Sequence, residues 1–288
     1  MPQPRQLADV INAGTNYLAQ NKIPFPRVAA ELLVARLLNC RRLELYQLGN
    51  LILTESQLAA LRRGFKRVAA CEPIQYVLGE WDFRGLSLKV DKRALIPRPE
   101  TEELVSCVLD TKELWLQNSP LIVDVGTGSG CIVLSLAKER PQARYIAIDA
   151  SKNALELAQE NAIRNTLADQ VEFRVGYNCG DFIAGSVDTI VSNPPYIPSA
   201  EIAKLDACIR NHEPHMALDG GADGLEIIKN IIPDAHMVLR KGGWIFLEIG
   251  DGQGPAVREI LEKMGFIEVM IKADLSGKTR YAIARNGN

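Results

Sequence analysis

The run Leu121-Ile-Val-Asp-Val-Gly-Thr-Gly-Ser-Gly130 decides the fold of this chain. A short, mostly apolar segment leads directly into three alternating glycines, and an apolar run typical of a helix follows from Cys131 to Lys138. Glycine lets the backbone turn sharply and approach a ligand closely, with the N-terminus of the next helix facing it. The run therefore predicts a buried strand, a ligand-binding loop and a helix.

Strand-like and helix-like segments alternate after this run. A strand over 145–148 ends at Asp149, roughly twenty residues after the glycines, where a carboxylate can accept both hydroxyl protons of a ribose. Further strands are expected at 171–175, 187–191 and 243–249, and a terminal antiparallel hairpin at 266–273 and 279–284. This alternation predicts an α/β fold with a mostly parallel sheet and helices on both faces.

The spacing of the glycines bears on the cofactor. Gly126-x-Gly128-x-Gly130 departs from the G-x-G-x-x-G pattern of dinucleotide sites. Asp124 just before the loop would repel a pyrophosphate, and it suits a cationic ligand end such as the amino acid part of S-adenosylmethionine. The spacing favours S-adenosylmethionine over NAD, with an NAD-dependent or non-catalytic nucleotide-binding protein as the alternative.

A proline-rich loop follows the predicted strand over 187–191. Neither strand nor helix can continue through Pro194 and Pro195, so Asn193-Pro194-Pro195-Tyr196 forms a stiff loop. The carboxyl ends of parallel strands share one edge, which places this loop opposite the glycines. The Asn193 side-chain oxygen and the Pro194 carbonyl can each accept one N–H of a planar amino group, while Tyr196 packs flat on it. We predict Asn193, Pro194 and Tyr196 as catalytic residues, and all four as substrate-binding.

The chain before the sheet reads as two smaller parts. Apolar spacing predicts a bundle of about four helices over 1–75, and a β-hairpin linker around Gly85 over 76–96. The catalytic domain is expected over 97–288. Arg98 between two prolines makes a rigid connector, either a plain linker or a wall of the cleft, and Thr101 is expected to cap a helix beginning near Glu102.

Bulk properties exclude several classes of protein. The 288 residues carry a net charge of −2, without the basic surplus typical of nucleic-acid binding. No apolar run reaches about 18 residues and the N-terminus lacks a signal-peptide core, so we expect a cytoplasmic protein without membrane contact. No metal site is expected, because the cysteines form no CxxC pair and Pro214 interrupts His212-Glu-Pro-His215.

Several motifs together resemble the protein-glutamine methyltransferases of the HemK/PrmC family. The glycine run, Ile148-Asp-Ala-Ser151 and Val191-Ser-Asn-Pro-Pro-Tyr-Ile-Pro198 carry the resemblance. Leu95-Ile-Pro-Arg-Pro-Glu-Thr-Glu102, the segment 217–225 and Glu248-Ile-Gly250 with Gln253 support it along the chain. Asn-Pro-Pro-Tyr alone also occurs in adenine-N6 DNA methyltransferases.

The resemblance implies a fold, a reaction and a partner. The fold is the Rossmann-like S-adenosylmethionine-dependent methyltransferase fold, with a seven-stranded sheet and an N-terminal helical bundle. The reaction is methyl transfer to the side-chain amide nitrogen of the glutamine in the Gly-Gly-Gln motif of peptide chain release factors, which dock on the bundle. We expect a monomer that binds no nucleic acid directly. Alternatives are a ribosomal-protein glutamine or a nucleic-acid adenine as the acceptor.

The glycine loop, the strand-end acid and the resemblance together give a set of cofactor-binding residues. The family usually has an acid and then a large apolar residue near the adenine, and these places fall on Tyr177 and Asn178, or on Asp181 and Phe182 if the loop is shifted. The predicted set is Gly126, Thr127, Gly128, Ser129, Gly130, Asp149, Asn178 and Asn193.

Overall fold

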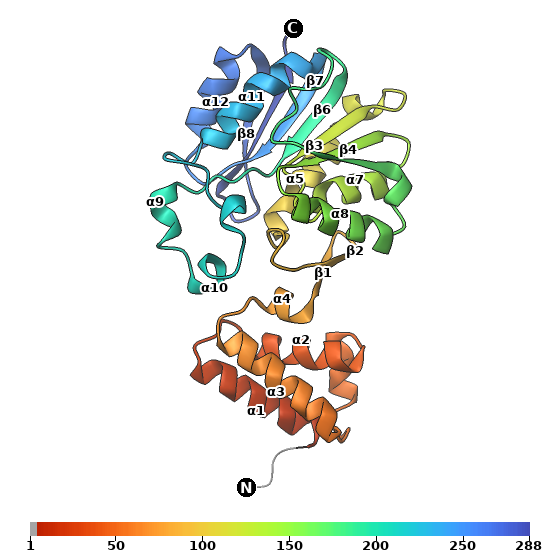
Figure 1. The fold of residues 1–288 in the computed structure, drawn as a ribbon, viewed down its shortest axis with the longest axis vertical. Helices are drawn as coiled ribbons and strands as arrows, with labels where there is room; N and C mark the ends of the chain where they lie inside the picture. The colour runs from red at the N-terminus through yellow and green to blue at the C-terminus, as the bar shows by residue number, and fades with distance from the viewer. Residues whose placement is uncertain (1–4) are drawn as a thin grey trace. The chain divides into compact units, whose positions relative to one another are not determined.

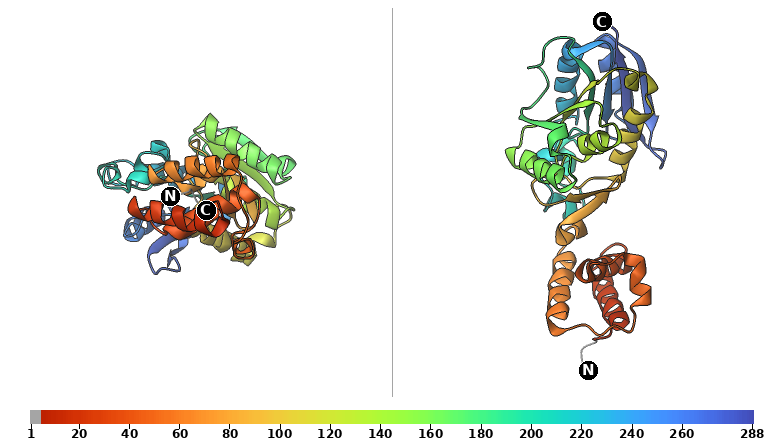
Figure 2. Two further views of the ribbon diagram at one scale, coloured as in Figure 1. Left: turned by 90° about the horizontal axis from the view of Figure 1, so that it is seen from below. Right: turned by 90° about the vertical axis from the view of Figure 1, so that its right-hand side faces the viewer.

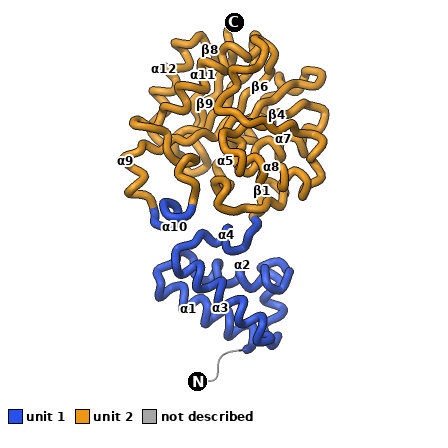
Figure 3. The backbone as a smooth tube through the Cα atoms, in the orientation of Figure 1, with its two compact units in different colours: residues 1–80, 206–212 blue, residues 81–205, 213–288 orange. Residues whose placement is uncertain are grey.

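The computed structural model describes residues 5–288 (Figure 1). The chain divides into two compact units, coloured separately in Figure 3. The first unit contains residues up to Glu80 together with Asp206–His212, and the second contains Trp81–Leu205 and Glu213–Asn288. Asp206–His212 therefore belongs to the N-terminal unit although it lies far along the chain. The predicted division of the chain at residues 75 and 96 does not include this segment in that unit. No helix in the described part is long and apolar enough to cross a membrane.

The first unit is helical. Its apolar stripes meet in one core that includes Leu7, Leu18, Leu33 and Phe65. The predicted capping box is present, because the Gln57 N–H donates to Thr54 Oγ1 at 3.3 Å and the Thr54 N–H donates to Gln57 Oε1 at 2.9 Å. Its elements are α1 (Leu7–Gln20), α2 (Pro26–Leu38), the 3₁₀ helix η1 (Arg42–Gln47), α3 (Glu55–Ala69), α4 (Ile74–Leu78) and α10 (Ala207–Arg210).

The predicted hairpin is confirmed, but it is shorter than the sequence indicated. Strands β1 (Glu80–Phe83) and β2 (Leu86–Lys89) form a two-stranded sheet around Gly85. Residues 76–78, expected in this hairpin, belong instead to helix α4, which begins at Ile74. Pro73 is the N-cap of this helix and Gly79 ends it with a φ of 74°, a left-handed conformation that glycine adopts readily.

The second unit contains a seven-stranded sheet in the order β5-β4-β3-β6-β7-β9-β8. The five neighbouring strands β5, β4, β3, β6 and β7 pair in parallel, while β9 is antiparallel to both β7 and β8. This confirms the α/β fold and the terminal hairpin. The strands are β3 (Leu121–Val125), β4 (Arg144–Asp149), β5 (Val171–Val175), β6 (Val187–Ser192), β7 (Leu239–Glu248), β8 (Phe266–Ala273) and β9 (Thr279–Asn286).

Helices cover both faces of this sheet (Figures 1 and 2). Helices α5, α7 and α8 lie on one face, and α11 and α12 lie on the other with Val123 and Val125 in their shared core. The helices of the unit are α5 (Pro99–Asp110), α6 (Lys112–Trp115), α7 (Cys131–Glu139), α8 (Lys152–Arg164), η2 (Ala168–Gln170), α9 (Ser199–Ile202), η3 (His215–Ala217), α11 (Glu226–Val238) and α12 (Gly254–Lys263).

The register of the central strands positions the loops at the carboxyl edge. Val125 at the end of β3 pairs with Ile148 on one side and with Ser192 on the other. The loops that start after these residues therefore begin side by side, which brings the glycine run, Asp149 and Asn193 to the same place.

Candidate active site

A cavity of about 380 Å³ lies at the carboxyl edge of the sheet. The glycine loop, the end of β4, the loop after β6 and the connector before α5 all contribute to it. The predicted residues in its lining are Gly126, Thr127, Gly128, Ser129, Asp149, Asn193, Pro194 and Pro195, whereas Gly130, Asn178 and Tyr196 lie outside the lining.

The glycine loop is held by the carboxylate of Asp149. The Gly128 N–H donates to Asp149 Oδ2 at 2.8 Å, and the Ser151 N–H donates to Oδ1 at 2.8 Å. Burial raises the pKa of this carboxyl, while the two backbone N–H groups lower it. Gly128 adopts a φ of 57°, which an L side chain would resist. Asp149 thus both lines the cavity and fixes the shape of the loop opposite it.

Asp124 lies behind the loop rather than in the lining of the cavity. Its side chain is completely buried, and its Oδ2 accepts a hydrogen bond from Thr127 Oγ1 at 2.7 Å. Burial raises the pKa of this carboxyl to about 7. Asp124 was expected against a cationic ligand end, but its carboxylate instead holds Thr127, the second residue of the loop.

Asn193 projects into the cavity with a defined orientation. Ser192 just before it is fixed, because its Oγ donates to the Val125 carbonyl at 2.6 Å. The Asn193 Nδ2 donates to Thr101 Oγ1 at 3.0 Å, so the side-chain oxygen points away from Thr101. Pro194 and Pro195 form the adjoining wall. The loop therefore presents the acceptor side of the Asn193 amide.

Thr101 and Glu248 are the polar residues of this region whose roles sequence reasoning missed. Thr101 does not cap α5 as expected, because the helix already begins at Pro99, and its Oγ1 instead donates to Glu248 Oε2 at 2.8 Å. Glu248 ends the otherwise apolar run Trp244-Ile-Phe-Leu-Glu248, and a single acid ending a buried strand is a signal that was available.

Tyr196 contacts the same buried carboxylate. Its hydroxyl donates to Glu248 Oε1 at 3.2 Å, and its ring packs against the core of the sheet. The hydroxyl is thereby directed behind Asn193 rather than into the cavity. Stacking of the ring on a substrate amide stays a prediction.

The connector before α5 forms one wall of the cavity. Arg98 lines it and pairs with Glu213, whose side chain is almost fully buried. Glu213 Oε2 also accepts a hydrogen bond from the Ile96 N–H at 3.2 Å. The alternative of a plain linker therefore does not describe this segment, because Glu213 ties it to the chain that follows the Asn193 loop.

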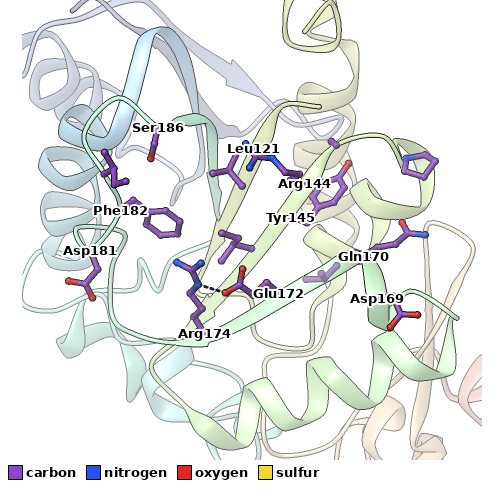
Figure 4. Close-up of a pocket in the computed structure, with 15 residues that line it drawn as sticks. Leu121, Arg144, Tyr145, Asp169, Gln170, Glu172, Arg174, Asp181, Phe182 and Ser186 are labelled. Carbon is purple, nitrogen blue, oxygen red and sulfur yellow. Dashed lines mark hydrogen bonds and ion pairs between the residues drawn. The ribbon is translucent and has the colours of Figure 1, made fainter. Parts of the chain in front are cut away.

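The residues proposed for the adenine separate into two places. Tyr177 lines the cavity, whereas the Asn178 Oδ1 accepts from the Gly180 N–H outside it. Asp181 and Phe182 line a different hollow of about 710 Å³ (Figure 4). The arrangement favours Tyr177 over Asp181 and Phe182 as the neighbour of a ligand in the cavity.

That second hollow lies over the amino-terminal half of the sheet. No helix connects β5 to β6, so the starts of β3 and β4 are left open on this side. Figure 4 shows the ion pair of Glu172 and Arg174, which are 2.7 Å apart, among the residues that line it. Ligands in open α/β sheets bind at the carboxyl ends of strands, so we assign the active site to the smaller cavity. No group of three or more potential metal ligands occurs within residues 5–288.

Comparisons with known proteins agree along most of the chain. Residues 9–79 match the family model described as the PrmC N-terminal domain, and residues 101–220 match the methyltransferase small domain. Solved structures that share the fold include the hMettl16 catalytic domain (TM-score 0.58, 20% identity, 76% of this chain and 82% of that one) and a methyltransferase from Pyrococcus furiosus (TM-score 0.51, 19% identity, 82% and 100%). These confirm the Rossmann-like methyltransferase fold.

Closer similarity links the chain to curated proteins. A release factor glutamine methyltransferase of Koribacter versatilis is 38% identical over 280 residues, which cover 97% of this chain and 98% of that protein. The protein of that name from Geobacter sulfurreducens is 36% identical over 99% of both chains. The human MTRF1L release factor glutamine methyltransferase is 36% identical over 97% of this chain and 87% of its own length. The chain therefore belongs to the family of release factor glutamine methyltransferases.

Proposed function

We propose that this protein transfers a methyl group from S-adenosylmethionine to the side-chain amide nitrogen of the glutamine in the Gly-Gly-Gln motif of a peptide chain release factor. The observation that carries the proposal is the orientation of Asn193. Its amide nitrogen donates to Thr101 Oγ1 at 3.0 Å, so its oxygen is available as an acceptor. Asp149 and the glycine loop line the same cavity.

The residues of the cavity fit this cofactor. One Asp149 oxygen accepts from the glycine loop at Gly128 and the other from the Ser151 N–H, and the residue still borders the cavity, where a carboxylate can accept the hydroxyl protons of a ribose. Tyr177 and Met216 offer apolar surface for a flat base. When bound, S-adenosylmethionine supplies an electrophilic methyl group on a sulfonium.

Asn193 and Pro194 bind and orient the acceptor amide. An amide nitrogen is a poor nucleophile because its lone pair is delocalised into the carbonyl. The Asn193 side-chain oxygen and the Pro194 carbonyl each accept one N–H, which favours charge developing on the nitrogen and directs its lone pair toward the glycine loop. The stiff Pro194-Pro195 backbone keeps the two acceptors at a fixed separation. We assign no general base, since the proton can leave after the transfer.

The first unit supplies the docking surface for the release factor in this proposal. Several large apolar side chains of this unit are exposed, which is a feature of protein-binding surfaces. They are Phe25, Leu43, Tyr46 and Ile52.

One assay separates the candidate substrates. Wild-type protein is incubated with methyl-labelled S-adenosylmethionine and with a release factor, a total ribosomal-protein fraction or duplex DNA. We expect label on the release factor alone, and none on a release factor whose Gly-Gly-Gln glutamine is replaced by alanine. Label on a ribosomal protein or on DNA would replace the proposed substrate.

Replacing Asn193 tests the assigned chemistry. We expect Asn193→Ala to lower kcat on the release factor by about 100-fold to 1,000-fold, as removal of one positioned polar group does in other transition-state sites. Affinity for S-adenosylmethionine, measured by calorimetry, should change little. Near-normal turnover of this variant would refute the role of Asn193.

A further inference from the structure

Four residues form a hydrogen-bonded chain behind the active-site cavity. The Asn193 Nδ2 donates to Thr101 Oγ1 at 3.0 Å, and Thr101 Oγ1 donates to Glu248 Oε2 at 2.8 Å. The Tyr196 hydroxyl donates to the other oxygen of Glu248 at 3.2 Å. Thr101 and Asn193 line the cavity, whereas Glu248 and Tyr196 do not. The chain thus connects a group in the cavity to a carboxylate outside its lining.

The direction of each hydrogen bond is determined by the carboxylate. An ionised carboxylate only accepts, and a hydroxyl has one proton to give. Since Thr101 gives its proton to Glu248, its oxygen can only accept from Asn193. The amide of Asn193 must then turn its nitrogen toward Thr101 and its oxygen toward the opposite side.

Burial makes this arrangement selective. Thr101 is 2% exposed and Glu248 is 1% exposed, so water does not compete for these hydrogen bonds. A buried donor or acceptor left without a partner costs about 1–3 kcal/mol, which disfavours the flipped amide. In that orientation the Asn193 oxygen would face the oxygen of Thr101.

We propose that Thr101 and Glu248 are positioning residues, and that the ionised Glu248 carboxylate, acting through Thr101, holds the Asn193 amide with its oxygen toward the substrate. The proposal deepens the role assigned to Asn193 and rests on the proposed function only for its kinetic test. If Glu248 is protonated, it can donate to Thr101, whose own proton is then free for the Asn193 oxygen. The flipped amide becomes as favourable as the productive one.

The surroundings of Glu248 place its titration near neutrality. Burial raises the pKa of its carboxyl to about 7, the Thr101 and Tyr196 hydroxyls and Arg280 on β9 lower it, and Glu100 on α5 raises it. Tyr281 on β9 and Cys131 on α7 also lie within electrostatic range. Activity should therefore rise as the pH increases through about 7, when the carboxylate forms.

The kinetic test uses side chains of matched shape. We expect Thr101→Val and Glu248→Gln each to lower kcat on the release factor by about 10-fold to 100-fold, with unchanged affinity for S-adenosylmethionine and an unchanged KM for the release factor. Thr101→Ser should restore most of the rate. The matched control is Thr189→Val, because the Thr189 hydroxyl is buried in β6 and has no hydrogen-bond partner within residues 5–288. The rise of kcat with pH should disappear in Glu248→Gln.

A spectroscopic test does not depend on methyl transfer. The side-chain ¹⁵N–¹H resonances of Asn193, assigned by their loss in Asn193→Ala, should shift with pH through about 7 in the wild type and stay constant in Glu248→Gln. Constant resonances in the wild type, or a Thr101→Val enzyme with wild-type kcat, would overturn the proposal. A wild-type enzyme that shows this titration but does not methylate release factors would contradict only the proposed function.

Discussion

Asp149 combines two tasks in one side chain. Its two oxygens accept the Gly128 and Ser151 N–H groups at 2.8 Å each, and the same carboxylate borders the cavity. A charged acceptor of this kind contributes about 1.5–3 kcal/mol per hydrogen bond. The residue therefore shapes the glycine loop, and in the proposed function its remaining lone pairs accept the hydroxyl protons of a ribose.

Replacing this carboxylate should weaken cofactor binding. We expect Asp149→Ala to raise the Kd for S-adenosylmethionine about 10-fold to 150-fold, the range that the loss of one such hydrogen bond implies. Isothermal titration calorimetry measures this directly. Asp169→Ala is the control, since it removes an exposed charge of the same unit outside the cavity lining. Equal affinities of Asp149→Ala and wild type would refute the assignment.

Single residues also mark the limit of what the sequence could tell. The positions of Asn193, Asp149 and the glycines were predictable because each lies at or just after the end of a strand, where the fold itself dictates the position. Thr101 was predicted as a helix cap, which is its commonest local role, but its partner Glu248 is 147 residues away. Contacts of that separation depend on how two elements meet and leave no local pattern.

At the level of elements, one glutamine joins three loops at the carboxyl edge. The Gln253 Oε1 accepts from the Gly250 N–H at 2.8 Å, and its Nε2 donates to the carbonyls of Tyr196 at 2.9 Å and Gly224 at 3.2 Å. A side chain on Gly224 would place a Cβ 2.4 Å from the Tyr196 carbonyl. The segment over 217–225 is glycine-rich because its backbone must approach the Asn193 loop this closely.

Loss of this connection should loosen the loop that carries Asn193. We expect Gln253→Ala to lower the unfolding free energy of the second unit by about 1–3 kcal/mol, because three partly buried backbone groups lose their partner and water can replace it at some of them. Turnover on the release factor should also fall. Gln253→Glu should be worse, since a carboxylate would face two carbonyl oxygens. Gln170→Ala, an exposed glutamine, serves as the control. A Gln253→Glu enzyme as stable as wild type would contradict this account.

Element boundaries were predictable where periodicity was clear. Strands β3, β5 and β8 begin and end at the predicted residues. Strand β7 begins at Leu239, four residues before the predicted start. The prediction was wrong there because Lys241-Gly242-Gly243 resembles a turn in the sequence. The pairing of β6 with β7 contains a register shift between Val187 and Thr189, which absorbs these residues within the strand. The sequence alone does not distinguish such a bulge from a turn.

For the whole molecule, the two units can be followed separately. Tryptophan occurs only at Trp81, Trp115 and Trp244, and all three lie in the second unit. Tryptophan fluorescence therefore reports the unfolding of the unit that contains the cavity, without a signal from the N-terminal helices. This matters because a chain of two units need not unfold in one step.

The second unit should lose stability as the pH rises toward neutrality. Burial raises the pKa of Asp124 and of Glu248 to about 7 from ordinary values of 3.8 and 4.5. Between about pH 4.5 and 7 the folded unit thus binds more protons than the unfolded chain, so the free energy of unfolding falls as pH increases. Asp274 and Glu160, whose pKa values are lowered to about 2, act in the opposite sense, but only below this range.

Urea unfolding at pH 5, 6, 7 and 8, followed by tryptophan fluorescence, measures this slope. Wild type should be most stable near pH 5, and Glu248→Gln should show a flatter dependence because its side chain carries no charge to bury. The difference between the two proteins should change by on the order of 1–3 kcal/mol from pH 5 to pH 8, at about 1.4 kcal/mol per unit of pKa shift. Identical slopes would mean that Glu248 has the same pKa in the folded and the unfolded protein. Glu248 would then be ionised throughout this pH range, and its ionisation could not explain a rise of activity near pH 7. A flatter slope in Glu248→Gln would instead show that the charge needed in the active site is maintained at the expense of stability.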